Sequence, residues 1–107
     1  MPFEVLLAED AERDIEDIHA YIFEADGTAR ADGIIDDLEA LCLNLAKLPE
    51  RGNTPKELRN LGITEYREVH DKPYRVIYRI FESRVIVYAV LDGRRDMESL
   101  LQRRLLR

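Results

Sequence analysis

The sequence is poor in the residues that build covalent and metal-based scaffolds. Its 107 residues include one cysteine, two histidines, two serines and no tryptophan. The lone Cys42 cannot form an internal disulfide, and one cysteine with two histidines is too few for a cysteine-rich zinc site. We therefore predict no metal and no cofactor. With only Ser83 and Ser99 available, a Ser-His-Asp hydrolase is also disfavoured.

Long apolar runs are missing as well. No segment approaches the roughly 18 apolar residues of a membrane span, and the first residues, MPFEVLLAEDAERD, turn acidic before any signal-type apolar stretch. We predict a cytoplasmic protein that does not contact a membrane. Because 46% of the residues are hydrophobic and 36% are charged, the chain should fold, and its length suits one domain spanning residues 1–107.

The two halves of the chain carry opposite charge. Residues 1–50 hold 14 Asp/Glu and 3 Lys/Arg, whereas residues 51–107 hold 8 Asp/Glu and 13 Lys/Arg. Two interpretations stay open: a solvated acidic helical face that precedes an arginine-rich sheet, or a basic surface that binds an anionic partner. Thirteen of the sixteen cations are arginine, the side chain suited to bidentate carboxylate and phosphate contacts. The acidic half argues against a general nucleic-acid binder.

Hydrophobic periodicity predicts a strand and two helices in the first half. Alternation in residues 1–8 is typical of a strand, and apolar residues three and four apart from Glu9 onward predict an amphipathic helix that stops at Gly27. Thr28 is the expected N-cap of a second helix, which should run to Pro49. The two helices should form a hairpin that packs across a sheet.

The second half predicts strands. A loop over 49–62, with a short helical turn at 56–61, precedes a weak strand over 64–70 and clear strands over 74–81 and 85–91. Residues 94–107 predict a short tail helix capped by Asp96 or Asp92. The expected fold class is α+β, a small, mainly antiparallel sheet with an N-terminal helical hairpin on one face. The tail helix either covers the other face or leaves it open to another chain.

Two arginines on the best strand are the main functional question. Arg75 and Arg79 are four residues apart and therefore project from one sheet face, on either side of Ile77. If that face is buried, carboxylates from a neighbouring strand or from the acidic helices must pair with them. Alternatively, arginines gather near Tyr66 and Tyr74 on a concave face that accepts an acidic protein segment or RNA phosphates. The arginines in that gathering are Arg67, Arg75, Arg79, Arg94 and Arg95.

The sequence resembles a family of bacterial toxins. The segments YREVHDKPYRVIYRI and VIVYAVLDGRRDMESLLQRRLL, together with AERDIEDIHAYI and LAKLPERG, are similar to the RelE/ParE superfamily of type II toxin-antitoxin toxins. That family has a small sheet bearing an N-terminal helical hairpin, which agrees with the elements predicted above. The resemblance implies a toxin that causes growth arrest and a cognate antitoxin that neutralises it.

The RelE-like branch of the superfamily is one alternative. Its members cleave messenger RNA on the ribosome, using basic residues and a Tyr or His in the tail. If this chain were such an RNase, the resemblance would assign catalysis to Arg95, Arg79 and Arg75. However, Leu101 stands where these enzymes carry tyrosine, no Tyr or His follows Tyr88, and the loop before the sheet offers only Lys56 where several lysines are usual.

The ParE-like branch is the favoured alternative. Its members inhibit DNA gyrase, and their ending of Val-Leu-His, a basic residue, Met-Asp and a leucine-rich basic helix is similar to VLDGRRDMESLLQRRLL. Asp96 fits that pattern, whereas Asp92 replaces the His and Arg95 the Met. A gyrase inhibitor needs a binding surface and no catalytic base, so we expect a protein that is not an enzyme.

The resemblance also implies partners and contact residues. We expect an antitoxin whose disordered tail folds over the toxin, laying an amphipathic segment on the hairpin and sheet, within a toxin-antitoxin hetero-oligomer. DNA gyrase is the expected target, and no sequence-specific nucleic-acid binding by the toxin alone is expected. The candidate residues for binding target or antitoxin are Arg67, Tyr74, Arg75, Arg79, Arg94, Arg95, Arg103 and Arg104.

Overall fold

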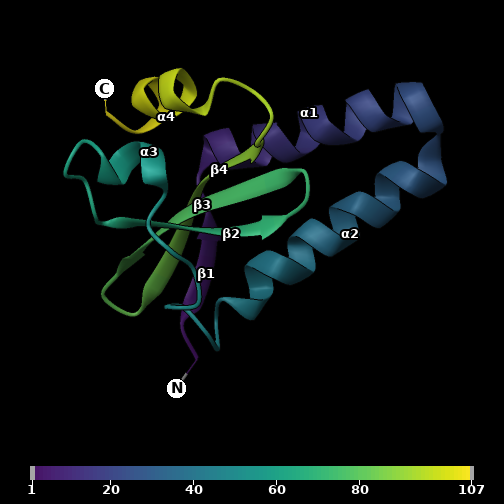
Figure 1. Cartoon of the computed structure of the whole chain (residues 1–107). Coiled ribbons are helices and arrows are strands. Elements are labelled where there is room, and N and C mark those ends of the chain that lie inside the picture. The colour runs from purple at the N-terminus through teal and green to yellow at the C-terminus, as the bar shows by residue number, and fades with distance from the viewer. Residues whose placement is uncertain (1, 107) are drawn as a thin grey trace.

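Residues 2–106 fold into four helices and four strands (Figure 1). The structure, a computed structural model, describes residues 2–106. In chain order the elements are β1 (Glu4–Leu7), α1 (Glu9–Asp26), α2 (Thr28–Asn44), α3 (Lys56–Arg59), β2 (Tyr66–Asp71), β3 (Tyr74–Phe81), β4 (Arg84–Asp92) and α4 (Met97–Leu105).

The strands form one open sheet in the order β1-β4-β3-β2. The pairs β2–β3 and β3–β4 are antiparallel, whereas β1 lies parallel to β4. The helical pair between β1 and the rest of the sheet supplies the long crossover that a parallel pairing needs. The predicted fold class is confirmed: a mainly antiparallel sheet with an N-terminal helical hairpin and a short C-terminal helix.

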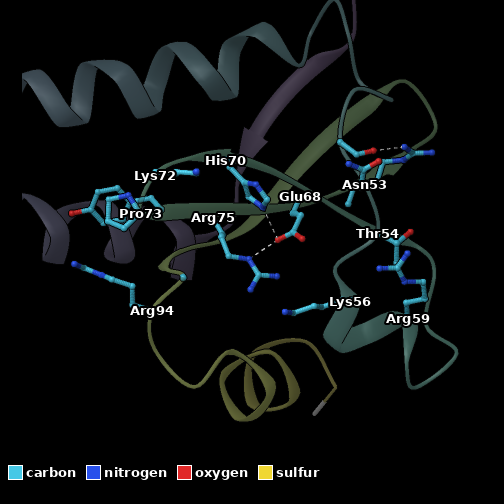
Figure 2. Close-up of a pocket in the computed structure, with 14 residues that line it drawn as sticks. Asn53, Thr54, Lys56, Arg59, Glu68, His70, Lys72, Pro73, Arg75 and Arg94 are labelled. Atoms are coloured by element: carbon cyan, nitrogen blue, oxygen red, sulfur yellow. Dashed lines mark hydrogen bonds and ion pairs between the residues drawn. The ribbon is translucent and has the colours of Figure 1, made fainter.

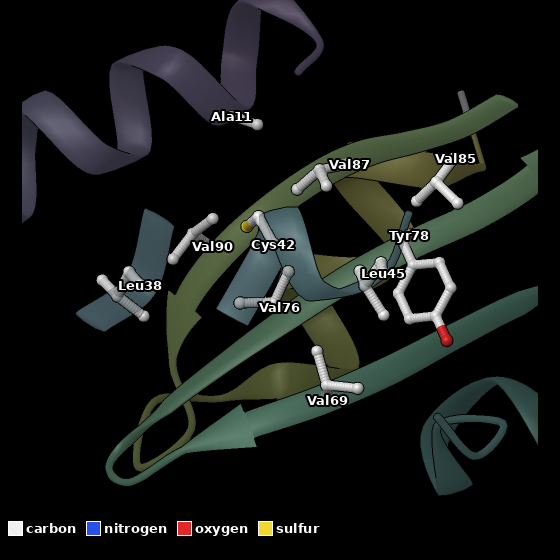
Figure 3. Packing of buried hydrophobic residues seen from close by; sticks show 10 residues of the cluster. All are labelled: Ala11, Leu38, Cys42, Leu45, Val69, Val76, Tyr78, Val85, Val87 and Val90. Carbon is white, nitrogen blue, oxygen red and sulfur yellow. The ribbon is translucent and has the colours of Figure 1, made fainter. Parts of the chain in front are cut away.

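The helical hairpin covers one face of the sheet. Helix α1 packs against β4 and α2 against β2, each through the apolar stripe that the sequence predicted. Figure 3 shows the resulting core, in which side chains of the hairpin meet valines of the sheet. Its buried members are Ala11, Leu38, Cys42, Leu45, Val69, Val76, Tyr78, Val85, Val87 and Val90.

Helices α3 and α4 cover the opposite face. A second core forms there around Ile77 of β3, with Leu58 from α3 and Leu101 from α4 fully buried. The tail helix therefore covers the remaining sheet face, which the sequence had left open. Asp96 caps α4 by accepting the Ser99 N–H. Of the two caps that the sequence allowed, Asp96 and Asp92, it is therefore Asp96 that is observed.

A bulge in β4 adapts the sheet to its two cores. Ile77 pairs with Ala89 but Tyr78 pairs with Val87, so Tyr88 has no partner on β3. This extra residue shifts the alternation of side chains, and Val87 and Val90 both face the helical hairpin although they are three residues apart.

A carboxylate from α1 and a guanidinium from α4 bind the backbone of β4 at this bulge. Asp14 Oδ2 accepts the Val90 N–H at 2.9 Å, and Arg104 makes a bidentate pair with Asp14 at 3.0 and 2.7 Å. Arg104 also donates to the Tyr88 carbonyl oxygen at 3.1 Å. Because the Asp14 and Arg104 side chains are 13% and 17% exposed, the pair joins the first helix to the last in a mostly dry environment.

Three local predictions need correction. Thr28 is not an N-cap: Gly27, with φ of 90°, ends α1 and precedes α2, so Thr28 is already helical and makes no side-chain cap bond. Helix α2 ends at Asn44 and not at Pro49, because the following turn is held by the Phe3 N–H on the Ala46 carbonyl at 2.8 Å. The strands predicted over 1–8 and 64–70 are observed as Glu4–Leu7 and Tyr66–Asp71.

The ends of the chain limit two further predictions. Met1 belongs to the predicted first strand and Arg107 to the predicted tail helix, and both lie outside the described residues. None of the helices within residues 2–106 is both long enough and apolar enough to span a membrane.

Asp14 should matter more to stability than its partner. In Arg104→Ala, Asp14 still accepts the Val90 N–H, whereas Asp14→Ala leaves that N–H unpaired and leaves Arg104 with only the Tyr88 carbonyl and a longer contact to Asp10. We expect the free energy of unfolding to fall by about 2 kcal/mol for Arg104→Ala and about 3–4 kcal/mol for Asp14→Ala in urea titrations. Arg13→Ala, which removes an exposed pair with Glu9, should change it by less than about 0.5 kcal/mol. Equal losses at Asp14 and Arg104 would contradict the assignment.

Candidate binding cleft

An open cleft of about 950 Å³ lies beside α3, over one end of β2 and β3. Its walls come from the loop that follows α2, from α3, from the β2–β3 turn and from Gly93 and Arg94 after β4. Its lining holds one carboxylate, Glu68, and seven basic side chains: Lys56, Arg59, Arg67, His70, Lys72, Arg75 and Arg94. This concentration of basic groups in a concave surface favours anionic ligands.

Arg75, in the centre of the cleft, is already paired (Figure 2). Its Nε donates to Glu68 at 2.5 Å, and its two terminal nitrogens donate to the two oxygens of Glu57 at 2.9 and 2.8 Å. The three side chains are only 10–13% exposed. Of the two alternatives left by the sequence, Arg75 therefore forms an internal ion pair. Its partners come from β2 and α3, and not from the acidic helices.

The ion pair shifts the pKa of Glu57 and of Arg75. Hydrogen bonding to Arg75 lowers the pKa of the Glu57 carboxyl despite the opposing effect of burial. The same hydrogen bond raises the pKa of the Arg75 guanidinium. Glu68 Oε1 also lies 3.3 Å from His70 Nε2, and His70 is half exposed to the cleft. The centre thus holds two carboxylates, one guanidinium and one imidazole.

Two glycines allow the backbone to form the walls. A Cβ on Gly52 would overlap the Glu68 carbonyl and approach the Tyr78 hydroxyl, and a Cβ on Gly93 would lie 2.8 Å from Arg75 Cδ. The Gly52 N–H donates to the Tyr78 hydroxyl at 3.0 Å, and that hydroxyl donates to the Pro49 carbonyl at 2.7 Å. Tyr78 therefore joins the core to the cleft.

Arg67 completes this wall. One nitrogen of its guanidinium donates to the carbonyl oxygens of Glu50 at 3.0 Å and Gly52 at 2.7 Å. A side chain that satisfies two loop carbonyls holds the loop in place. Arg67 is thus a structural part of the cleft wall as well as a lining residue.

The predicted binding residues divide into two groups. Arg67, Tyr74, Arg75 and Arg94 line the cleft, whereas Arg79, Arg95, Arg103 and Arg104 do not. Arg79 lies with its guanidinium carbon 6.0 Å from the centre of the Phe81 ring, and Arg94 pairs with Asp92 at 2.6 Å on the surface. Arg95 and Arg103 are exposed on and before α4.

Several cleft residues were absent from the sequence-based candidates. Arg59 and Lys72 line the cleft although nothing singled them out, and Glu57 and Glu68 neutralise its centre. The available signal was the cluster of charged residues in the loop and turn on either side of β2. Lys56 was noted in the sequence, and it lines the cleft together with His70.

Other reactive groups lie away from the cleft. Cys42 is buried in the first core, where loss of solvent raises the pKa of its thiol to about 11. Leu101, at the position of the tyrosine of RelE-like enzymes, is fully buried in the second core. Within residues 2–106, no group of three His, Cys, Asp or Glu side chains is placed so that it could hold a metal ion.

Comparison with known families identifies the class of protein to which this fold belongs. The family described as ParE toxin of type II toxin-antitoxin system, parDE, matches residues 5–97. The chain belongs to this ParE toxin family, within the RelE/ParE superfamily, and is a toxin of the type II toxin-antitoxin class. No curated protein sequence matches it significantly.

Solved structures show the same fold. A chain of the chromosomal ParDE toxin-antitoxin system from P. aeruginosa superimposes with a TM-score of 0.71 at 14% identity, over 82% of this chain and 92% of that one. A chain of the toxin-antitoxin complex RelBE2 from Mycobacterium tuberculosis superimposes with a TM-score of 0.63 at 21% identity, over 86% and 92%.

Removing Arg75 should invert the response of stability to pH. In the wild type, the lowered pKa of Glu57 contributes stability above its unfolded value of 4.5 that is lost as pH falls through the folded pKa. In Arg75→Ala, two buried carboxylates lie together without a cation, so protonating one of them relieves repulsion. We expect a loss of about 3 kcal/mol at pH 7 and a smaller loss at pH 5.

The measurement is urea unfolding of both proteins at the two pH values. Arg59→Ala is the control, because the structure gives this exposed cleft cation no ion pair within residues 2–106. It should unfold like the wild type at both pH values. If Arg75→Ala loses more unfolding free energy at pH 5 than at pH 7, relative to the wild type, Arg75 does not neutralise the two carboxylates.

Proposed function

We propose that this toxin inhibits DNA gyrase by binding it, without catalysing a reaction, and that a cognate antitoxin neutralises it. The observation that carries the proposal is the state of Arg75. Three of its five N–H groups are donated to Glu57 and Glu68, and these two carboxylates outweigh its single positive charge, which disfavours a role in stabilising the charge of a phosphate in a transition state. A protein that acts by binding alone does not need Arg75 for this purpose.

The tail helix supports the same conclusion. RNA cleavage through the 2′-hydroxyl needs a group that protonates the leaving oxygen. Leu101 occupies the corresponding tail position and is buried against the sheet, and no Tyr or His follows Tyr88 in the sequence. The tail thus offers packing and charge, and no acid or base of the required kind.

We place the gyrase contact on the exposed cations of the tail. Arg95 and Arg103 are exposed and make no ion pair within residues 2–106, and Arg94 is 76% exposed beside Asp92. Arg104 serves a different purpose, because Asp14 holds it against the sheet. The proposed target surface is therefore Arg94 and Arg95, just before α4, and Arg103 on α4, a helix whose position Arg104 fixes.

The helical hairpin suits the antitoxin. Both similar structures come from toxin-antitoxin systems, ParDE and RelBE2. On the hairpin side of this chain, an apolar recess of about 280 Å³ is bounded by Val5, Leu7, Ile15 and Leu43, and Leu43 is 66% exposed. An amphipathic segment laid over this recess would bury apolar surface that is otherwise in contact with water.

A RelE-like mRNA endonuclease is the second candidate, and one observation favours it. His70 lies in the basic cleft with its Nε2 near Glu68, an arrangement in which an imidazole can take a proton from a 2′-hydroxyl. In that case His70, and not a tail residue, would be the base. Lys56 and Lys72 would then be the nearest lysines in the cleft for holding phosphate.

A supercoiling assay with purified gyrase, plasmid and ATP tests the proposal. We expect the wild type to inhibit supercoiling, the antitoxin to reverse inhibition, and Arg95→Glu/Arg103→Glu to raise the half-inhibitory concentration at least about tenfold by reversing charge at the contact. Arg13→Glu/Lys47→Glu, which changes the same number of exposed cations elsewhere, should stay near the wild type. No inhibition by folded protein, with ribosome-dependent RNA cleavage that His70→Gln abolishes, would establish the endonuclease.

A further inference from the structure

The cations of the cleft are arranged in two groups. Figure 2 shows Lys72 and Arg94 on one side of Arg75, and Lys56 and Arg59 on the other side. The first group comes from the β2–β3 turn and the segment after β4, which a hydrogen bond from the Gly93 N–H to the Pro73 carbonyl joins at 2.8 Å. The second group belongs to α3.

Both groups offer cations without a buried carboxylate partner, whereas the cation at the centre is already paired. Lys56, Arg59 and Lys72 form no ion pair within residues 2–106, and the pair of Arg94 with Asp92 is open to solvent. Between the groups, the single charge of Arg75 faces the two charges of Glu57 and Glu68. These three side chains together carry one net negative charge, which repels an anion.

This pattern distinguishes between two kinds of anionic ligand. A nucleic-acid strand carries a phosphate at every nucleotide, so a strand long enough to reach both groups would also place a phosphate next to Glu68. Beyond Lys72, the adjoining recess adds Arg30 but also the carboxylates of Asp26, Asp37 and Asp71, so it offers a further phosphate no net positive charge. A peptide carries charge only where its sequence has an acidic residue, and it can leave the centre uncharged.

We propose that the cleft binds an extended peptide segment with two acidic positions separated by uncharged residues. One carboxylate pairs with Lys72 and Arg94, the other pairs with Lys56 and Arg59, and the uncharged spacer crosses Arg75 and Glu68. Asn53 and Thr54 also line the cleft and provide polar side chains for the peptide backbone. The proposal rests on the proposed function in one respect, because we take the segment to be part of the antitoxin.

Fluorescence anisotropy with synthetic peptides tests the site. The probes are labelled peptides with two Glu pairs joined by Ser/Leu spacers of graded length, a peptide with the same residues but all glutamates adjacent, and a single-stranded RNA of equal net charge. We expect tightest binding at one spacer length and weaker binding of both the adjacent-glutamate peptide and the RNA. RNA that binds more tightly than every peptide would overturn the proposal in favour of a nucleic-acid cleft.

Matched variants locate the binding. Lys56→Gln/Arg59→Gln and Lys72→Gln/Arg94→Gln should each weaken the best peptide at least about tenfold, since each removes one carboxylate contact. Arg13→Gln/Lys47→Gln, exposed on the hairpin side and beyond α2, removes the same charge and should change affinity by less than about twofold. Equal weakening by all three variants would indicate general charge attraction and overturn the proposal.

The failures remain distinguishable. If a double variant does not show the wild-type circular dichroism spectrum, Lys56→Gln and Lys72→Gln alone provide the comparison, because neither lysine takes part in an ion pair of the described chain. The peptide assay contains no gyrase, and the gyrase assay contains no peptide. A wild-type protein that inhibits gyrase but binds none of the peptides would reject the cleft assignment alone. A wild-type protein that binds the peptides but does not inhibit gyrase would reject the gyrase target alone.

Discussion

The bond between Arg75 and two carboxylates is the constraint on which the cleft depends. It joins β3 to β2 through Glu68 and to α3 through Glu57, and it does so in a setting that is nearly closed to solvent. Removing either the guanidinium or the carboxylates leaves uncompensated buried charge, so the loss of one of the three residues should destabilise the cluster. Their pairing also decides which part of the cleft can bind an anion. The most central arginine is structural, and the cations free to bind a ligand are those at the two ends.

A second ion pair has the corresponding role on the other side of the sheet. Asp14 and Arg104 bring the first and last helices together over the bulge of β4, and Asp14 satisfies the Val90 N–H at the same time. Since α4 covers one sheet face and α1 the other, this pair fixes the position of the tail relative to the hairpin. The arginine-rich second half is therefore not one basic surface. Part of its charge is internal, part lines the cleft, and part is exposed on the tail.

The helices and strands could largely be predicted from hydrophobic periodicity, whereas the strand neighbours and the ion-pair partners could not. Alternation in β3 placed Val76 and Arg75 on opposite faces correctly, and the apolar run of β4 predicted a strand covered on both sides. The parallel pairing of β1 was not predicted, because periodicity carries no information about strand neighbours. The ion-pair partners of Arg75 could not be predicted from the sequence either. Glu57 and Glu68 are 18 and 7 residues away along the chain, and only the tertiary fold shows that they meet there.

The most direct test of a binding mechanism is to remove the charge from the centre of the cleft. In Glu57→Leu/Glu68→Leu/Arg75→Leu, apolar side chains replace a nearly buried ion cluster, a change that proteins often tolerate when all partners are replaced together. Gyrase supercoiling is measured with this variant after its fold has been verified by circular dichroism. Inhibition within about threefold of the wild type is predicted, because Arg75 has no part in target contact. Loss of inhibition by the folded variant would contradict a structural role for Arg75 and assign it to the functional site.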